Sequence, residues 1–138
     1  MTILIDSNVP MYLVGGEHPN RVRARQVLEI AIAAREHLVT DAEAFQEILH
    51  RYVAINRRDA IEPAWNALQR VVDEVYAIEL ADVERARSLV LTSRLTARDA
   101  LHVAVMQRHD IAEILSFDTA FDNIPGLRRL PDPTALDS

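Results

Sequence analysis

Four acidic residues from distant parts of this sequence occupy positions that suit metal-dependent chemistry. Asp6 ends an apolar strand expected at Thr2–Ile5, and Asp118 follows a later apolar strand. Asp99 begins a helix, and Glu47 lies on the helix that follows the second strand. In a parallel α/β sheet, the carboxyl ends of strands and the amino ends of helices meet at one edge, where ligands bind. We therefore predict that these four carboxylates lie together.

The physics of such a cluster favours a divalent cation. Carboxylates a few ångströms apart cannot all remain ionised, because each charge raises the pKa of its neighbours. A bound cation removes this cost, and hard oxygen ligands suit Mg²⁺ or Mn²⁺. Such a centre can activate water and stabilise an in-line displacement at phosphorus. The sequence therefore predicts a metal-dependent hydrolase acting on phosphodiester bonds.

Nearby polar residues have structural interpretations as well. Thr40 and Glu43 have the spacing of a capping box, which favours a structural role for Glu43. Asp122 follows Asp118 by four residues and is an additional candidate acid, whose participation the sequence leaves open. His102 lies on an apolar helix and is interpreted as a structural histidine rather than a catalytic base.

The charged residues neither exclude nor demand a nucleic-acid substrate. The net charge of −6 is unfavourable for binding a polyanion. All 15 basic residues are arginine, which binds phosphate through two parallel hydrogen bonds. Arg94 and Arg98 flank the predicted site and are candidate substrate contacts. Arg21, Arg23 and Arg25 share one helix and are further candidates for binding phosphate.

Composition indicates one domain of ordinary size. The chain has 138 residues, of which 49% are hydrophobic, and it contains no cysteine. The lack of cysteine excludes a disulfide scaffold, a thiolate zinc site and a cysteine nucleophile. Neither a P-loop nor a Gly-x-Gly-x-x-Gly motif occurs. We expect a cytoplasmic protein, because no signal peptide or membrane span is recognisable.

Alternating apolar runs and helical patterns predict an α/β domain with a parallel sheet over residues 1–131, followed by a loose C-terminal tail at 132–138. Strands are expected at Thr2–Ile5, Leu38–Val39 and Val75–Leu80, within Ile111–Phe117, and at Gly126–Leu130. Helices are expected at Asn8–Gly15, Pro19–Glu36, Ala42–Ile55, Ala60–Val72, Ala81–Leu91 and Arg98–Arg108. In the second helix, the predicted apolar face consists of Val22, Val27, Leu28, Ile30 and Ala31.

Four motifs in this order resemble the PIN-domain family, and within it the VapC-type toxins of bacterial toxin–antitoxin pairs. The matching segments are Ile-Leu-Ile-Asp6-Ser-Asn, Gln46-Glu47-Ile-Leu, Leu95-Thr-Ala-Arg-Asp99-Ala-Leu-His102-Val-Ala and Ile114-Leu-Ser-Phe-Asp118-Thr-Ala-Phe-Asp122. Their order, spacing and span agree with the family over nearly the whole chain.

The resemblance implies a single PIN-like domain whose parallel five-stranded sheet has helices on both faces. Asp6, Glu47, Asp99 and Asp118 match the family's metal-binding acids, Asp122 matches a more variable acid, and Ser7 matches a small hydroxyl residue beside the first acid. The activity implied is Mg²⁺- or Mn²⁺-dependent endoribonuclease cleavage, often of transfer or ribosomal RNA, which stops translation. The implied partners are an RNA substrate, a cognate small antitoxin and a second copy of the chain.

Two other classes of function compete with this interpretation. A haloacid-dehalogenase-type phosphatase needs Asp-x-Asp where this chain has Asp6-Ser7-Asn8, and it uses a lysine that this chain lacks. The main alternative is a non-catalytic acidic domain that docks a basic protein partner.

Overall fold

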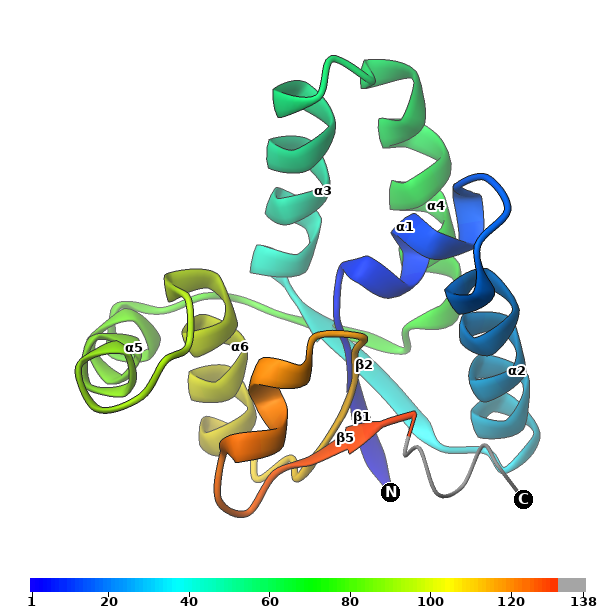
Figure 1. The fold of residues 1–138 in the computed structure, drawn as a ribbon. Helices are drawn as coiled ribbons and strands as arrows, with labels where there is room; N and C mark the ends of the chain where they lie inside the picture. The colour runs from blue at the N-terminus through cyan, green and yellow to red at the C-terminus, as the bar shows by residue number, and fades with distance from the viewer. Residues whose placement is uncertain (132–138) are drawn as a thin grey trace.

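Five parallel strands form the sheet of the computed structural model, which describes residues 1–131 (Figure 1). The strands are β1 (Thr2–Ile5), β2 (His37–Asp41), β3 (Glu74–Tyr76), β4 (Glu113–Leu115) and β5 (Arg128–Leu130). Their order across the sheet is β3-β2-β1-β4-β5, and every pair is parallel. The predicted α/β fold with a parallel five-stranded sheet is therefore confirmed.

Six α-helices cover both faces of this sheet (Figure 1). They are α1 (Asn8–Val14), α2 (Pro19–Ala33), α3 (Ala42–Ala54), α4 (Ile61–Val71), α5 (Leu80–Thr92) and α6 (Ala97–Arg108), with 3-10 turns at Arg58–Ala60 and Thr119–Asn123. Alternation along the strands separates two cores. Ile3 and Ile5 pack with α1 to α4, whereas Leu4 packs with α5 and α6. No helix within residues 1–131 is long and apolar enough to cross a bilayer.

The strand order places a crevice between β1 and β4. The chain runs outward from β1 through β2 to β3, then returns across the other face to β4 on the opposite side of β1. In open α/β sheets, ligands bind at such a reversal point, beyond the carboxyl ends of the strands. Ile5 pairs with Leu115, and the backbone N–H of Asp6 donates to the Leu115 carbonyl at 3.0 Å. Asp6 and the segment after β4 are thereby fixed side by side.

The third strand is shorter than the sequence predicts. The strand expected at Val75–Leu80 ends at Tyr76, and α5 begins at Leu80. A reciprocal capping box between Glu79 and Asp82 starts α5 at this point, with the Glu79 N–H donating to Asp82 Oδ2 at 2.9 Å. The local capping interaction thus ends the extended segment. The tail predicted at 132–138 lies outside the described residues.

The buried face of α2 also differs from the prediction. Ala24, Leu28 and Ala31 are buried, but Val22 and Ile30 are exposed. Each of the two exposed residues lies two positions from a buried one, which is about 200° around a helix. The true stripe follows the spacing i, i+4, i+7, and the wider apolar face inferred from sequence is wrong.

Because only one of them is buried, we expect substitutions of Leu28 and Ile30, which lie two positions apart on α2, to have unequal effects on stability. Leu28→Ala should lower the free energy of unfolding by about 2 to 5 kcal/mol, because it leaves a cavity in a packed core. Ile30→Ala, which removes a side chain that is 66% exposed, should change it by less than about 0.5 kcal/mol. Chemical denaturation measures both values, and equal losses would contradict the assigned face.

Candidate functional site

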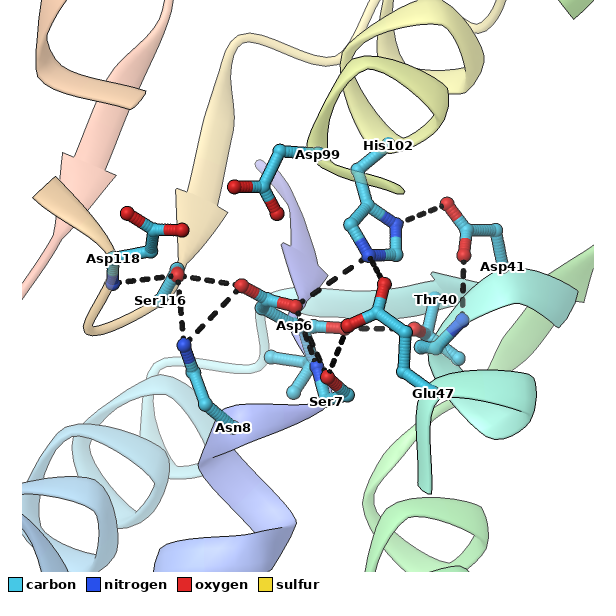
Figure 2. Close-up of polar contacts among 12 residues, drawn as sticks. Asp6, Ser7, Asn8, Thr40, Asp41, Glu47, Asp99, His102, Ser116 and Asp118 are labelled. Carbon is cyan, nitrogen blue, oxygen red and sulfur yellow. Dashed lines mark hydrogen bonds and ion pairs between the residues drawn. The ribbon is translucent and has the colours of Figure 1, made fainter. Parts of the chain in front are cut away.

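Asp6 lies at the centre of a polar cluster at the end of β1 (Figure 2). Its carboxylate is buried and accepts hydrogen bonds from the Ser7 N–H at 2.7 Å and the Ser116 hydroxyl at 2.6 Å. The Asn8 amide donates to the same carboxylate at 3.3 Å. Burial raises the pKa of Asp6, while the charge of His102 opposes that rise. The side chain is held firmly, but its negative charge is only partly balanced.

Glu47 reaches the cluster from α3 and is buried beside Asp6. Its Oε2 accepts from the Ser7 hydroxyl at 2.6 Å, and its Oε1 faces His102 Nε2 at 2.6 Å. The Ser7 hydroxyl also lies 3.4 Å from Asp6 Oδ1, so it sits between the two acids. Both oxygens of Glu47 therefore have partners supplied by this chain.

His102 is a buried cation among the site's acids. Its Nδ1 lies 2.7 Å from Asp41 Oδ2, its Nε2 lies 2.6 Å from Glu47 Oε1, and Asp6 Oδ1 is 3.5 Å from the same Nε2. Burial alone would lower the pKa of His102, but Asp41 and Glu47 raise it well above its ordinary value. Because both nitrogens face carboxylates, both donate. The interpretation of His102 as a hydrogen-bonded buried histidine agrees with the structure, but its partners are the acids of the site.

Asp41 is a site residue that the sequence analysis did not single out. It is the N-cap of α3, with Oδ1 accepting from the Ala44 N–H at 3.0 Å, while Oδ2 holds His102. The capping box predicted between Thr40 and Glu43 is therefore wrong. The Thr40 hydroxyl instead donates to the carbonyl of Ile5 at 2.7 Å. An acid at the end of an apolar strand, as at Asp6, was the signal that could have identified Asp41.

Asp99 and Asp118 face each other across the crevice. Thr96 caps α6 by accepting from the Asp99 N–H at 3.2 Å. Burial, followed by the nearby Asp118 carboxyl and the charge of Asp6, raises the pKa of Asp99 to about 8. Asp99 in turn lowers the pKa of Asp118, because a protonated Asp99 donates to the Asp118 carboxylate. The two acids thus share one proton when no cation is bound.

One hollow of about 270 Å³ brings most of the predicted site residues together. We call it the acidic hollow, and its lining residues are Asp6, Ser7, Asn8, Met11, Glu47, Arg51, Thr96, Arg98, Asp99 and Asp118. All four predicted metal-binding acids, with Ser7 and Arg98, belong to it. Arg51 joins it from α3, one turn after Glu47, and was not anticipated.

Two candidate residues do not line the acidic hollow. Asp122 forms two hydrogen bonds with Arg129, at 2.7 Å to Nε and 3.1 Å to Nη2, so its carboxylate is occupied by a structural ion pair. Arg94 lines a separate hollow with Ser93 and Asn123. Glu43 is likewise absent from the lining, although burial and the charge of Glu47 raise its pKa.

The donor set of the acidic hollow fits a hard divalent cation. Carboxylate oxygens of Asp6 and Glu47 and a ring nitrogen of His102 lie within 4.8 Å of one another. Because His102 is a cation that donates to both acids, the carboxylates are the groups that would bind a metal ion. The raised pKa values of Asp6 and Asp99 show negative charge that the single imidazolium does not balance. Carboxylate oxygens are the ligands that Mg²⁺ and Mn²⁺ prefer. The side chains therefore suit such an ion at this crevice.

Comparisons with known proteins agree with this fold and this crevice. The PIN domain matches residues 3–127. Ribonuclease VapC13 of Mycobacterium tuberculosis is 58% identical to this chain over 129 residues, covering 93% of this chain and 98% of the relative. The chain therefore belongs to the PIN-domain family, in its VapC group.

Solved structures share the fold at low sequence identity. VapBC2 from Rickettsia felis, solved with a DNA fragment from its promoter, matches with a TM-score of 0.71 at 13% identity, covering 94% of this chain and 97% of that one. VapC20 of Mycobacterium tuberculosis, described as a toxin that cleaves the sarcin–ricin loop, matches with a TM-score of 0.65 at 19% identity, covering 85% and 90%. Each likeness supports the arrangement of strands and helices described above.

The pKa of Asp99 predicts how stability depends on pH without metal. Because its folded-state pKa of about 8 exceeds the ordinary 3.8, the folded protein binds this proton more strongly than the unfolded chain does. That stability is present at low pH and is lost as pH rises through about 8. In EDTA, Tm should therefore fall more steeply with pH for the wild type than for Asp99→Asn. Parallel pH profiles would contradict the assignment.

Proposed function

We propose that this chain is a metal-dependent endoribonuclease that acts as a toxin. The observation that carries the proposal is the convergence of Asp6, Glu47, Asp99 and Asp118 in one hollow at the reversal point of the sheet. The ribonuclease named among its relatives, which is 58% identical, supports RNA as the substrate. The expected reaction is hydrolysis, in which water attacks phosphorus and the bond to the 3′ oxygen breaks, leaving a 5′ phosphate and a 3′ hydroxyl.

Asp6, Asp99 and Asp118 would hold Mg²⁺ or Mn²⁺, with Glu47 binding directly or through water. A bound ion of this kind lowers the pKa of a coordinated water and stabilises negative charge on the phosphate. The chain's own hydrogen bonds prepare these ligands. Ser116 orients Asp6 at 2.6 Å, and Ser7 and His102 orient the two oxygens of Glu47, so the carboxylates need little rearrangement.

Arginines at the rim of the acidic hollow would hold the RNA backbone. Arg98 projects from α6 and Arg51 from α3, so they line the hollow from two different helices. Neither forms a salt bridge with any residue in the range 1–131. A guanidinium binds phosphate bidentately, which would place the flanking phosphates while the acids engage the cation. Local positive charge of this kind offsets the net charge of −6.

We propose three partners for this chain: a small antitoxin protein, a second copy of the chain and an RNA substrate. The match to VapBC2 supports a small antitoxin partner, and a basic side chain from such a protein would suit the acidic hollow. The family resemblance supports a homodimer, and a transfer or ribosomal RNA substrate whose cleavage in the cytoplasm stops translation. Translation arrest would follow from cutting either kind of RNA.

Mapping of RNA 5′ ends after brief induction tests the function. The wild type should create discrete new ends, and Asp99→Asn should create none while remaining folded, because it loses a central carboxylate. Asp122→Asn is the matched control, and it should cleave normally because Asp122 is paired with Arg129 outside the hollow. Cleavage by a folded Asp99→Asn protein would refute the site. Absence of new ends from a wild type that binds Mn²⁺ would favour a non-catalytic docking domain.

Asp41 offers a test of how Glu47 is oriented. Asp41→Asn keeps a good helix cap but removes the charge that holds His102. We expect Mn²⁺ affinity to fall by about tenfold or more, as for other residues that orient metal ligands. Isothermal titration calorimetry measures this, with Asp59→Asn as the same change at an exposed position. An unchanged affinity in Asp41→Asn would show that the ion pair does not prepare the site.

A further inference from the structure

We propose that a second surface, beyond the acidic hollow, binds the single-stranded RNA that extends from the cleavage site. It has two adjoining parts at the ends of α1. The aromatic row consists of Phe117, Tyr12 and His18, and the arginine hollow is lined by Glu17, His18, Pro19, Arg21, Val22 and Arg25. This inference rests on the proposed function, because it takes RNA to be the substrate.

The aromatic row begins on the segment that follows β4, next to Asp118. Phe117 lies between Ser116 and Asp118, and its N–H donates to Asn8 Oδ1 at 3.3 Å, which ties it to the start of α1. The Tyr12 ring packs edge-on against Phe117, with centroids 5.2 Å apart. Tyr12 keeps part of its surface accessible. Phe117 is likewise half-buried, so the aromatic row keeps accessible surface next to residues that line the acidic hollow.

The row leads to the arginine hollow along α1. The ring centroids of Tyr12 and His18 are 4.9 Å apart, and the exposed His18 lines the arginine hollow. Helix α1 connects the end of β1 to the segment before α2 that contains His18 (Figure 1). It has seven residues and so spans about 10 Å. A strand held at the acids would reach the arginine hollow within a few nucleotides.

The arginine hollow has unbalanced positive charge. Its volume is about 630 Å³, and Arg21 and Arg25 project from adjacent turns of α2. Neither guanidinium forms a salt bridge or hydrogen bond with another residue in the range 1–131, and Arg21 Nε is buried without an acceptor. An unpaired buried donor is costly, and a phosphate oxygen is an acceptor that suits a guanidinium. Glu17 is the only acid in the lining.

Single-stranded RNA fits both parts better than other anions do. An acidic enzyme of net charge −6 must hold a polyanion through local clusters of cations. Ring faces beside such a cluster form the usual combination for single strands, in which bases stack and arginines track the backbone. An acidic peptide would use the arginines and gain little from the rings. The two parts therefore predict different responses to substitution.

The decisive measurement is the salt dependence of RNA binding. A fluorescent single-stranded RNA is titrated with the Asp99→Asn protein, which is expected to bind without cutting. Adding Arg21→Gln and Arg25→Gln should weaken binding and reduce the slope of log affinity against log salt by about 1.4, or about 0.7 for each lost phosphate contact. Arg70→Gln with Arg87→Gln removes the same charge from α4 and α5 and should leave the slope unchanged.

The rings are tested with substitutions that spare the fold. His18 Nδ1 accepts from the Asn20 N–H at 3.0 Å as the cap of α2, so His18→Asn removes the ring but keeps a good cap. Combined with Tyr12→Leu, it should weaken binding by about tenfold with an unchanged salt slope. Equal Tm values exclude a folding defect.

The outcomes separate this inference from the proposed function. Unchanged affinity and slope in the arginine variant, with cleavage by the wild type intact, would overturn the second surface alone. Loss of affinity in the arginine variant but not in the ring variant would also overturn it, because it would indicate a general anion site. A wild type that cleaves no RNA would instead overturn the proposed function.

Discussion

The site depends on the cost of gathering negative charge inside a folded protein. Asp6, Asp41 and Glu47 are buried within a few ångströms of one imidazolium. Removing one partner of a buried ion pair leaves the other charge uncompensated, which strongly destabilises the fold. The three acids and His102 therefore depend on one another for their stability. His102 neutralises one side of the cluster and leaves the other, at Asp99, with a raised pKa. The structure thus stabilises the ligands without removing the negative charge that would attract a cation.

The fold supplies this arrangement through backbone pairing. The register between β1 and β4 sets Asp6 beside Ser116, and the cap of α3 sets Asp41 at the end of β2. Asp41 therefore serves local and tertiary structure together, since one oxygen starts the helix and the other fixes His102. Capping residues at the carboxyl edge of a parallel sheet lie where ligands bind, so a structural role and a role in the site do not exclude each other.

Sequence reasoning located the edge of the sheet but not the interactions across it. The acids at Asp6 and Asp118 were found because each ends an apolar strand, which is a local pattern. The partnership of His102 with Asp41 depends on how α3 and α6 pack, and no spacing within one segment shows it. Asp122 followed Asp118 at a plausible interval, but the pairing of β5 with β4 brings Arg129 to it. The sequence did not reveal these interactions, because each joins residues that only the tertiary structure brings together.

Net charge is a poor guide to the ligand of this protein, because its arginines divide into two groups. Arg108 and Arg129 are committed to acids of the fold, and they neutralise Asp82 and Asp122. Arg51, Arg98, Arg21 and Arg25 form no salt bridges within residues 1–131 and line the two hollows. The net charge also includes the carboxylates of the acidic hollow, whose negative charge a divalent cation would neutralise. A polyanion approaching this edge would therefore meet more positive charge than the total of −6 suggests.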